Sequence, residues 1–358
     1  MEIKKYIFTF NYAINYGAFL QCFALNNLGK DYVVADLTPR SLKRIKYCVG
    51  PYGRKKLPVI WIFLALYRFF KNYYVYRHYR FKECSMLVLS QNEKNWNNHK
   101  VRKYLDNSVA IIGSDQIWNP KMIEGMENVY FAGIADFSKR IAYAASIGMK
   151  EWPDSFKSRI ITRLKKFDAI SVREQSAVKY LNSIGIENVA WVCDPTLLNK
   201  GDFYKKKFGV KREYAYKYVF RYVIREKIPA SFFNFIDGQV ISVNAGNRNN
   251  FVSVSEWLSF INYSEYIVTD SFHCVVFCLL FHKNFIVVLN KSRGAGMNER
   301  FFSLLGKTNL MYRCVDVEDS LNMVKDKLFT EIDWNNIDFI LENWRKESLD
   351  WLNNALEF

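Results

Sequence analysis

The sequence predicts an α/β protein with two domains, each built on a parallel β-sheet with helices on both faces. The first observation is length, because 358 residues correspond to about two domains at roughly 150 residues each. The second is composition: 50% apolar and 24% charged residues, with only 7 Pro and 16 Gly, exclude disordered and fibrous classes. The third is the alternation of continuous Val- and Ile-rich runs with helical patterns, which is typical of strands buried between helices.

The first half of the chain alternates strand and helix patterns. Residues 6–10 predict a strand, residues 18–28 a helix that ends at Gly29, and residues 31–37 a second strand, which together make one βαβ unit. Further strands are expected within residues 108–115, 139–146, 168–174 and 188–195, and helices at 155–166 and around 177–181.

The second half repeats this alternation after a basic stretch at residues 205–217. We therefore place an N-terminal domain at residues 1–168 and a C-terminal domain at 169–330, facing each other across a central cleft. From about Asp333 onwards, apolar residues at helical spacing predict helices, at 331–358, that pack back on the first domain. Strands of the second half are expected within residues 216–223, 239–244, 265–271 and 284–290, and helices at 253–261 and through Cys278.

Positive charge is concentrated in residues 37–82, which we call the basic segment. It holds twelve Lys or Arg residues and no Asp or Glu, against a net charge of +16 for the whole chain. Its apolar run at residues 57–67 is too short to span a bilayer. Three interpretations remain open: a core helix with a solvated basic flank, a surface that lies on an anionic membrane, and a phosphate-binding surface for nucleic acid. Nucleic acid is not expected as a partner, because no nucleic-acid motif accompanies the charge.

The seven cysteines are scattered and lie mostly in apolar runs, which predicts reduced thiols in a cytoplasmic protein. The four histidines do not complete a metal-ligand spacing with them, so we expect no metal site. The N-terminus, MEIKKYIFTF, lacks the apolar stretch and cleavage site of a signal peptide.

Polar residues follow several predicted strands, and in parallel sheets ligands bind beyond the carboxyl ends of the strands. His273 follows the run YIV, together with Asp270 and Ser271, where the next helix begins. A histidine in this position can meet an anion or cap the helix. Farther along, Lys291, Arg293 and Arg300 surround two glycines in NKSRGAGMNER, a loop suited to phosphate or carboxylate oxygens.

The first half offers three further candidate positions. Arg173 leaves the strand DAISV and needs a counter-charge, which is either Glu174 or another acid, or an anionic ligand. In GSDQIWNP, Ser114 and Asp115 with Trp118 form either a helix cap or a sugar-facing acid and aromatic pair. Gly17, in the run Asn15, Tyr16 and Gly17, is the glycine of the turn between the first predicted strand and the first predicted helix.

An ordered set of motifs resembles the polysaccharide pyruvyl transferase family over roughly residues 8–315. The resemblance implies a GT-B-like pair of Rossmann-like domains, phosphoenolpyruvate as the donor co-substrate and a sugar hydroxyl as the acceptor. It also implies a pyruvate ketal on a cell-surface polysaccharide precursor such as exopolysaccharide or capsule, often carried on a polyprenyl lipid. The motifs are NYGAFLQCFAL, GSDQIWNP, YAASIG, SVREQSAVKYL, CDPTLL, TDSFHCVVF and NERFFSLL.

The resemblance also implies roles for the candidate residues and needs no further cofactor. His273 is expected to act as general acid, Asp115 to hold or deprotonate the acceptor hydroxyl, and Asp270 to orient His273. The acceptor side is expected at Asn15, Tyr16, Gly17, Ser114 and Trp118, and the donor side at Arg173, Ser271, Lys291, Arg293 and Arg300.

Two positions depart from the family pattern. Cys274 stands after the histidine where many members carry glycine, and Asn15, Tyr16 and Gly17 stand where many have glycine followed by Asp or Asn. A lipid-linked acceptor agrees with the membrane interpretation of the basic segment, so we expect a cytoplasmic protein, peripheral on the inner face of the cytoplasmic membrane. The alternatives are a GT-B glycosyltransferase that uses a nucleotide sugar, and a noncatalytic membrane- or nucleic-acid-binding protein.

Overall fold

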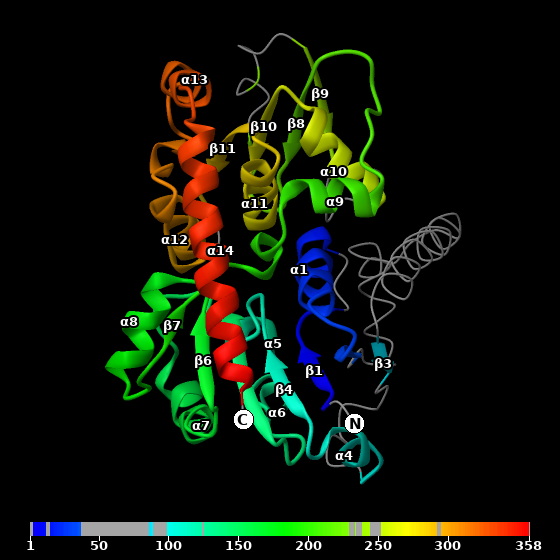
Figure 1. Cartoon of the computed structure of the whole chain (residues 1–358). Coiled ribbons are helices and arrows are strands. Elements are labelled where there is room, and N and C mark those ends of the chain that lie inside the picture. Colours follow the sequence, from blue (N-terminus) through cyan, green and yellow to red (C-terminus); the bar gives the residue numbers. More distant parts are fainter. Residues whose placement is uncertain are drawn as a thin grey trace, which may run out of the picture. The chain divides into compact units, whose positions relative to one another are not determined.

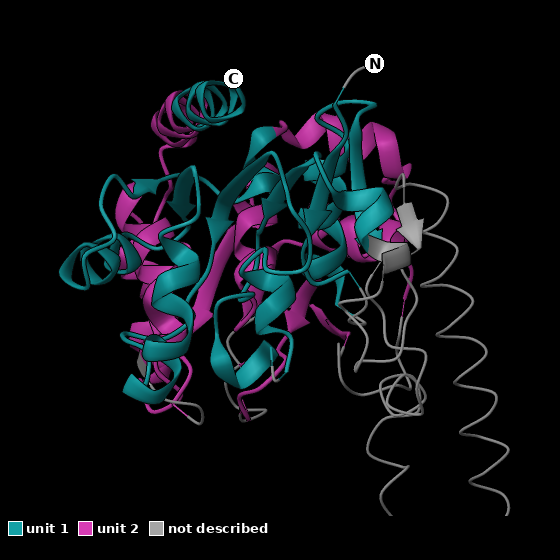
Figure 2. Cartoon of the chain, turned by 90° about the horizontal axis from the view of Figure 1, so that it is seen from below, with its two compact units in different colours: residues 1–198, 345–358 teal, residues 199–344 magenta. Residues whose placement is uncertain are grey.

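The chain forms two compact units, which we call unit 1 (residues 1–198 and 345–358) and unit 2 (residues 199–344; Figures 1 and 2). The basic segment lies outside the described residues, so its interpretations stay as the sequence leaves them. The computed structural model describes residues 3–11, 15–36, 86–88, 99–123, 125–228, 233, 238–243, 252–291 and 295–357.

Unit 1 contains a seven-stranded sheet in which every neighbouring pair is parallel, in the order β3-β2-β1-β4-β5-β6-β7. The strand order reverses between β1 and β4, and a switch of this kind opens a crevice for ligands at the carboxyl ends of the two strands. The strands are β1 Lys5–Phe8, β2 Tyr32–Asp36, β3 Met86–Val88, β4 Val109–Ile112, β5 Lys139–Ala145, β6 Ala169–Val172 and β7 Ala190–Trp191.

Helix α1 (Tyr16–Asn26) is buried along its whole length, as expected of a helix that is apolar on nearly all sides. Asn15 caps it by accepting hydrogen bonds from the backbone N–H groups of Gly17 (2.9 Å) and Ala18 (3.2 Å). The short helix η2 (Pro195–Leu198) packs against α1. The other helices of unit 1 are α4 His99–Leu105, α5 Pro120–Ile123, α6 Glu127–Tyr130, α7 Asp154–Leu164 and α8 Gln175–Ser183.

Unit 2 contains a five-stranded parallel sheet in the order β12-β11-β10-β8-β9, with its own order reversal between β8 and β10. Helix α10 (Val254–Tyr263) begins with a capping box between Ser253 and Glu256. The strands are β8 Tyr218–Tyr222, β9 Gln239–Ser242, β10 Tyr266–Thr269, β11 Asn284–Val288 and β12 Cys314–Val315. The helices are α9 Gly201–Phe208, α11 Phe272–Leu280, η4 Ala295–Asn298, α12 Glu299–Lys307, η5 Met311–Arg313 and α13 Leu321–Phe329.

The last helix, α14 (Trp334–Leu356), begins in unit 2 and ends in unit 1. Within unit 1, Arg345 Nε donates to the carbonyl oxygen of Leu197 (2.7 Å), and Ser348 Oγ accepts from the backbone N–H of Cys193 (3.0 Å). None of the helices in the described part of the chain is long and apolar enough to cross a membrane.

The α/β class and the two parallel sheets agree with the sequence prediction, but the domain boundary does not fall where we placed it. Strands β6 and β7 pair with β5 in the sheet of unit 1, so the division falls after Leu198 and not after Asp168. The displacement has a physical cause, since the sequence pattern marks each strand but not the sheet in which it pairs.

Candidate functional site

The carboxyl ends of strands β4 to β7 bring polar side chains together in unit 1. Asp115 and Ser114 follow β4, Arg173 follows β6, and Asp194 follows β7. Gly113, between β4 and Ser114, has φ of 133°, and a Cβ there would lie 2.0 Å from the carbonyl oxygen of Tyr143. Glycine is therefore required for the turn that presents Ser114 and Asp115 at this edge.

Arg173 lies at the centre of this group, which with Asp115, Glu174 and Asp194 we call the Arg173 cluster. Its guanidinium is 2.7 Å from Asp194 Oδ2, 3.5 Å from Glu174 Oε1 and 3.9 Å from Asp115 Oδ1. The side chain is only 1% exposed. Burial acts to lower the pKa of Arg173, but the nearby carboxylates outweigh it and raise that pKa above its ordinary value.

Two of the acidic members of the Arg173 cluster are held by neighbouring hydroxyl groups. Asp194 accepts hydrogen bonds from Thr196 Oγ1 (2.6 Å) and Ser114 Oγ (3.3 Å). Glu174 accepts one from Ser146 Oγ (2.6 Å). Three carboxylates thus surround one arginine, and a contribution of Arg173 to donor binding stays a prediction.

Asp115 is the member of the Arg173 cluster that reaches solvent, with its side chain 14% exposed. Its backbone adopts φ of 75°, a left-handed conformation uncommon outside glycine. The Oδ1 atom accepts from the backbone N–H of Gln116 (2.8 Å), and the main-chain oxygen accepts from that of Ser146 (3.0 Å). Asp115 is thus a carboxylate fixed at the sheet edge and partly open to a ligand.

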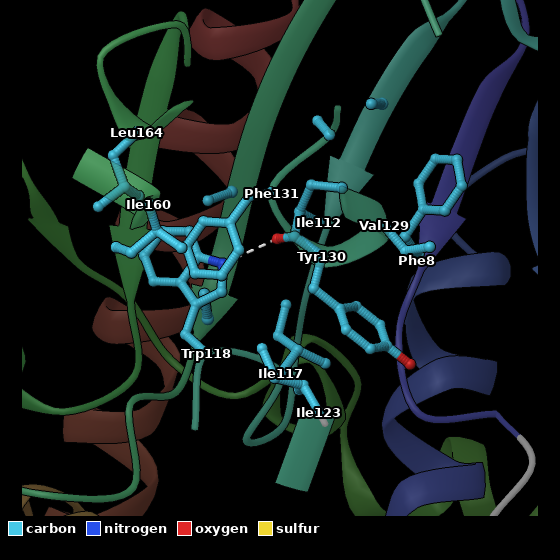
Figure 3. Close-up of a cluster of buried hydrophobic side chains, with 14 of the residues drawn as sticks. Phe8, Ile112, Ile117, Trp118, Ile123, Val129, Tyr130, Phe131, Ile160 and Leu164 are labelled. Atoms are coloured by element: carbon cyan, nitrogen blue, oxygen red, sulfur yellow. Dashed lines mark hydrogen bonds between the residues drawn. The ribbon is translucent and has the colours of Figure 1, made fainter. Parts of the chain in front are cut away.

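Two predicted acceptor residues do not lie in such an open position. Trp118 is fully buried, its ring stacks on Phe131 with centroids 5.5 Å apart, and its Nε1 donates to the carbonyl oxygen of Tyr130 (Figure 3). Its prediction as a sugar-facing ring is wrong, because no face of the ring is free. Ser114 is also fully buried and donates to the carbonyl oxygen of Ala144 (3.1 Å) as well as to Asp194.

The predicted acceptor residues of the first turn lie at the start of α1. Asn15 serves as the helix cap, while Tyr16 and Gly17 are buried in the first turn of the helix. A contribution of this turn to acceptor binding stays a prediction.

Arg173 belongs to unit 1, whereas we had placed it in the C-terminal domain beside the other donor residues. Ser271, His273, Lys291 and Arg300 all lie in unit 2. The counter-charge that the sequence left open is supplied by Asp194 and Glu174. Arg293 lies outside the described residues.

In unit 2, Asp270 lies at the order reversal between β8 and β10. Its Oδ1 accepts from the backbone N–H of Ile224 (2.7 Å), and its Oδ2 accepts from those of Arg225 (2.7 Å) and Glu226 (3.0 Å). The side chain is fully buried. Asp270 therefore anchors the loop at residues 224–226, and its expected orientation of His273 stays a prediction.

The N-terminus of α11 carries the histidine that the sequence singled out. Ser271 caps the helix by accepting from the backbone N–H of Cys274 (3.5 Å). His273 lies in the first turn, 6% exposed, with its ring packed edge-on to Phe272 at 5.3 Å between centroids. The capping and the histidine are thus separate features of one helix end, because Ser271 and not His273 is the cap.

The two described cations of the predicted donor loop differ in their surroundings. Lys291 Nζ lies 2.9 Å from Asp316 and 3.0 Å from Glu318, and these carboxylates raise the pKa of Lys291. Arg300, in the first turn of α12, is 7% exposed, and its guanidinium carbon lies 5.2 Å from the centroid of the Phe301 ring. Lys291 is therefore paired with carboxylates at the surface, while Arg300 is a buried cation at the start of α12.

Sequence reasoning placed Asp194 at a strand end but gave it no role, whereas in the structure it directly follows the short strand β7 and pairs with Arg173. It missed Asn290, which is the first polar residue after β11 and was passed over for Lys291. The rule that polar residues after a strand face the ligand edge would have found Asn290 as well. Within the described residues, no group of three or more His, Cys, Asp or Glu side chains is arranged to hold a metal ion.

The fold is similar to that of solved nucleotide-sugar enzymes. A putative UDP-N-acetylglucosamine 2-epimerase from Listeria monocytogenes matches 100% of this chain and 97% of its own, with a TM-score of 0.50 and 10% identity. S. aureus MnaA, solved with UDP, matches 99% of this chain and 98% of its own, with a TM-score of 0.49 and 11% identity. The Listeria likeness confirms the predicted GT-B-like class of two Rossmann-like α/β units.

The family model for polysaccharide pyruvyl transferases matches residues 15–292. The chain therefore belongs to the polysaccharide pyruvyl transferase family, as the ordered motifs indicated. The matched residues include the Arg173 cluster in unit 1 and the edge of unit 2 from Asp270 to Lys291. Among curated proteins, none is significantly similar to this chain in sequence.

Proposed function

We propose that this protein transfers the enolpyruvyl group of phosphoenolpyruvate to hydroxyl groups of a sugar, forms a pyruvate ketal and releases phosphate. The observation that carries the proposal is the family match, which spans the strand-end residues of both units. Phosphoenolpyruvate is an anion with a carboxylate and a phosphate, so its site requires hydrogen-bond donors and cations.

The donor half of the reaction is assigned to the strand ends of unit 2. Ser271 supports this, since it caps α11 directly after β10, where the backbone N–H groups of a helix N-terminus favour an anion, and Arg300 adds a cation in the first turn of α12. Protonated His273 gives its proton to the methylene carbon of phosphoenolpyruvate, which leaves an oxocarbenium-like centre at the adjoining carbon. General acid catalysis of this kind contributes about 10²- to 10⁴-fold in rate.

The acceptor half is assigned to Asp115. Its partly exposed carboxylate accepts the proton of the sugar hydroxyl as that oxygen bonds to the oxocarbenium carbon. A second hydroxyl then bonds to the same carbon, and its proton passes to the departing phosphate as the bond between that carbon and the phosphate oxygen breaks. The ketal and inorganic phosphate leave, and the proton held by Asp115 returns through solvent to His273, which restores both groups. In this scheme Arg173 supports Asp115 through the Arg173 cluster, because its buried guanidinium is already paired with carboxylates.

The acceptor is proposed to be a polysaccharide precursor on a polyprenyl lipid, at the inner face of the cytoplasmic membrane. The charge of the basic segment supports this placement, because each basic side chain near an anionic surface contributes about 1 kcal/mol. The protein is then a peripheral one, held by charge rather than by a spanning helix.

The first test measures phosphate release from phosphoenolpyruvate, with and without a panel of galactosides, mannosides and N-acetylhexosamines. Sugar-dependent release supports the proposal. In parallel, thermal shift compares phosphoenolpyruvate with UDP-sugars, since saturation at about 100 times the Kd stabilises a protein by about 2.7 kcal/mol. Stabilisation by UDP-sugars alone would replace the proposal with a nucleotide-sugar glycosyltransferase, and no response to either would favour a noncatalytic binding protein.

A second test addresses His273 directly. His273→Gln keeps a polar side chain of similar size but cannot deliver a proton at neutral pH. We expect kcat to fall at least 100-fold while phosphoenolpyruvate still protects the protein in thermal shift. Near-normal turnover would remove His273 from the mechanism, and loss of donor binding with unchanged kcat would assign it to binding alone.

A further inference from the structure

Asn290 is a buried polar residue whose side chain lacks a partner. It is 2% exposed, and both polar atoms of its carboxamide, Nδ2 and Oδ1, are buried with no hydrogen-bond partner in the part of the chain that the structure describes. Almost all buried polar side chains in proteins are hydrogen-bonded, because an unsatisfied one loses its water without compensation. A residue in this state destabilises the ligand-free protein and calls for an explanation.

The position of Asn290 is fixed by a second asparagine. Asn298 accepts a hydrogen bond from the backbone N–H of Asn290 (2.9 Å) and donates one from Nδ2 to the backbone oxygen of Asn290 (3.1 Å). Both polar groups of the Asn298 side chain are thus used to hold the main chain of Asn290. The side-chain carboxamide of Asn290 takes no part in these two hydrogen bonds.

Asn290 also lies at the edge to which the donor is assigned. It follows β11, and β11 runs parallel to β10, with Val287 level with Thr269. Asp270, Ser271 and His273 follow β10 at the same carboxyl edge. Asn298 directly precedes α12, whose first turn carries Arg300. The unpaired carboxamide therefore belongs to the same set of strand ends and helix starts as the proposed donor residues.

We infer that the Asn290 carboxamide binds an oxyacid group of the donor, a role that rests on the proposed function and adds a binding residue to it. Nδ2 donates to an anionic oxygen. Oδ1 accepts from a protonated one, which a monoprotonated phosphate offers, since the second pKa of a phosphate monoester is about 6. An uncharged carboxamide thus matches both kinds of oxygen on one phosphate group, and ligand binding removes both unsatisfied atoms at once.

The test compares Asn290→Leu with the control Asn322→Leu, at an exposed position of α13 in the same unit. Leucine has nearly the shape of asparagine without its polar atoms. We expect Asn290→Leu to melt at the same temperature as the wild type or higher without ligand, and to bind phosphoenolpyruvate at least 10-fold more weakly, which is about 1.4 kcal/mol. Asn290→Asp replaces the N–H₂ hydrogen-bond donor with a carboxylate oxygen, whose charge has the same sign as that of phosphoenolpyruvate. This variant should weaken the binding of phosphoenolpyruvate further.

The outcomes separate this inference from the proposed function. Wild-type affinity of Asn290→Leu for phosphoenolpyruvate overturns the inference and leaves the proposed function standing. If Asn290→Leu melts at a lower temperature but binds phosphoenolpyruvate as tightly as the wild type, Asn290 serves the fold, and the inference is also overturned. If the wild type neither binds nor consumes phosphoenolpyruvate, the proposed function fails, and the donor role of Asn290 fails with it.

Discussion

Asp115 and Trp118 are three residues apart in the chain, yet their side chains serve different parts of unit 1. The carboxylate of Asp115 lies at the sheet edge, whereas the indole of Trp118 joins the core cluster with Ile117, Phe131 and Ile160 (Figure 3). An acid followed closely by an aromatic is therefore not enough to indicate a sugar site. Which of the two faces the ligand depends on the turn that separates them.

Also at the scale of single residues, the Arg173 cluster leads to a prediction about the stability of the protein. Arg173→Met leaves buried carboxylates without their cation, and breaking a buried ion network of this kind costs about 3–5 kcal/mol. We expect that loss in the free energy of unfolding, measured by urea titration at pH 7. Arg173 substitutions are thus unsuited to testing catalysis in an intact fold.

The matched control is Arg159→Met on α7, whose guanidinium lies 3.5 Å from Glu127 at a 58% exposed position. Exposed pairs contribute at most about 1 kcal/mol, so this variant should unfold close to the wild type. Equal stability of the two variants would contradict the structural role of the Arg173 cluster.

At the scale of secondary-structure elements, Asp270 links the loop at residues 224–226 to strand β10. One carboxylate ties the start of that loop, which follows β8, to the end of β10 through three backbone N–H groups. The sequence placed Asp270 correctly at the strand end but could not reveal its partners. Backbone N–H groups are present at every residue except proline and leave no mark in the sequence pattern.

Asp270→Asn replaces one acceptor oxygen with an N–H₂ group that faces backbone donors. Hydrogen bonds to charged groups contribute about 1.5–3 kcal/mol, and we expect a loss in that range together with weaker donor binding. The pH profile of kcat decides between the two roles of Asp270: unchanged midpoints would leave it with the loop anchor alone, and a shifted midpoint would support the expected orientation of His273. Asp202→Asn, with a side chain 93% exposed, is the control.

How far the sequence predicts the elements depends on their surroundings. Strand β4, expected within residues 108–115 and observed at Val109–Ile112, is buried on both faces and gives a continuous apolar run. Strand β7 is limited to Ala190–Trp191 at the sheet edge, although the run at 188–195 suggested a longer one. The short helices α5 and α6 were missed, because four residues give too little periodicity to recognise.

The sequence predicted only part of the candidate site, for a related reason. The rule that polar residues follow buried strands located Asp115, Arg173 and His273 at strand ends. The pairing of Arg173 with Asp194 follows from β6 lying beside β7, and the order of strands in a sheet is set by tertiary packing. The sequence therefore indicated which residues reach the edges but not which of them meet.

At the scale of the whole molecule, the distribution of charge makes a prediction. Twelve of the sixteen net positive charges fall in the basic segment. Replacing Lys55 and Lys56 with Glu should weaken cosedimentation with vesicles that contain anionic lipid at low salt, because it reverses two of these charges. Wild-type binding by the double variant would return the segment to the core-helix interpretation, and vesicles of zwitterionic lipid are the control.

Helix α14 makes a second prediction at this scale. Its last part carries Leu352, which is 1% exposed, and Trp351, whose ring lies 6.2 Å from that of Tyr143. A chain that stops after Trp344 should lose hydrogen-exchange protection in unit 1 and keep it in the sheet of unit 2. Phe339→Ala, at a 67% exposed position of the same helix, should leave both units protected. Unchanged protection around Tyr143 in the shortened chain would contradict the prediction.

The placement of residues 345–358 also determines the order in which the units can be completed on the ribosome. Unit 1 contains residues 1–198, but its last segment follows the whole of unit 2. At about 5–20 residues per second, synthesis of the intervening residues takes roughly 7–30 seconds, and for that time the surface of unit 1 that α14 covers lacks its partner. Unit 1 is therefore completed only after the whole of unit 2 has been synthesised.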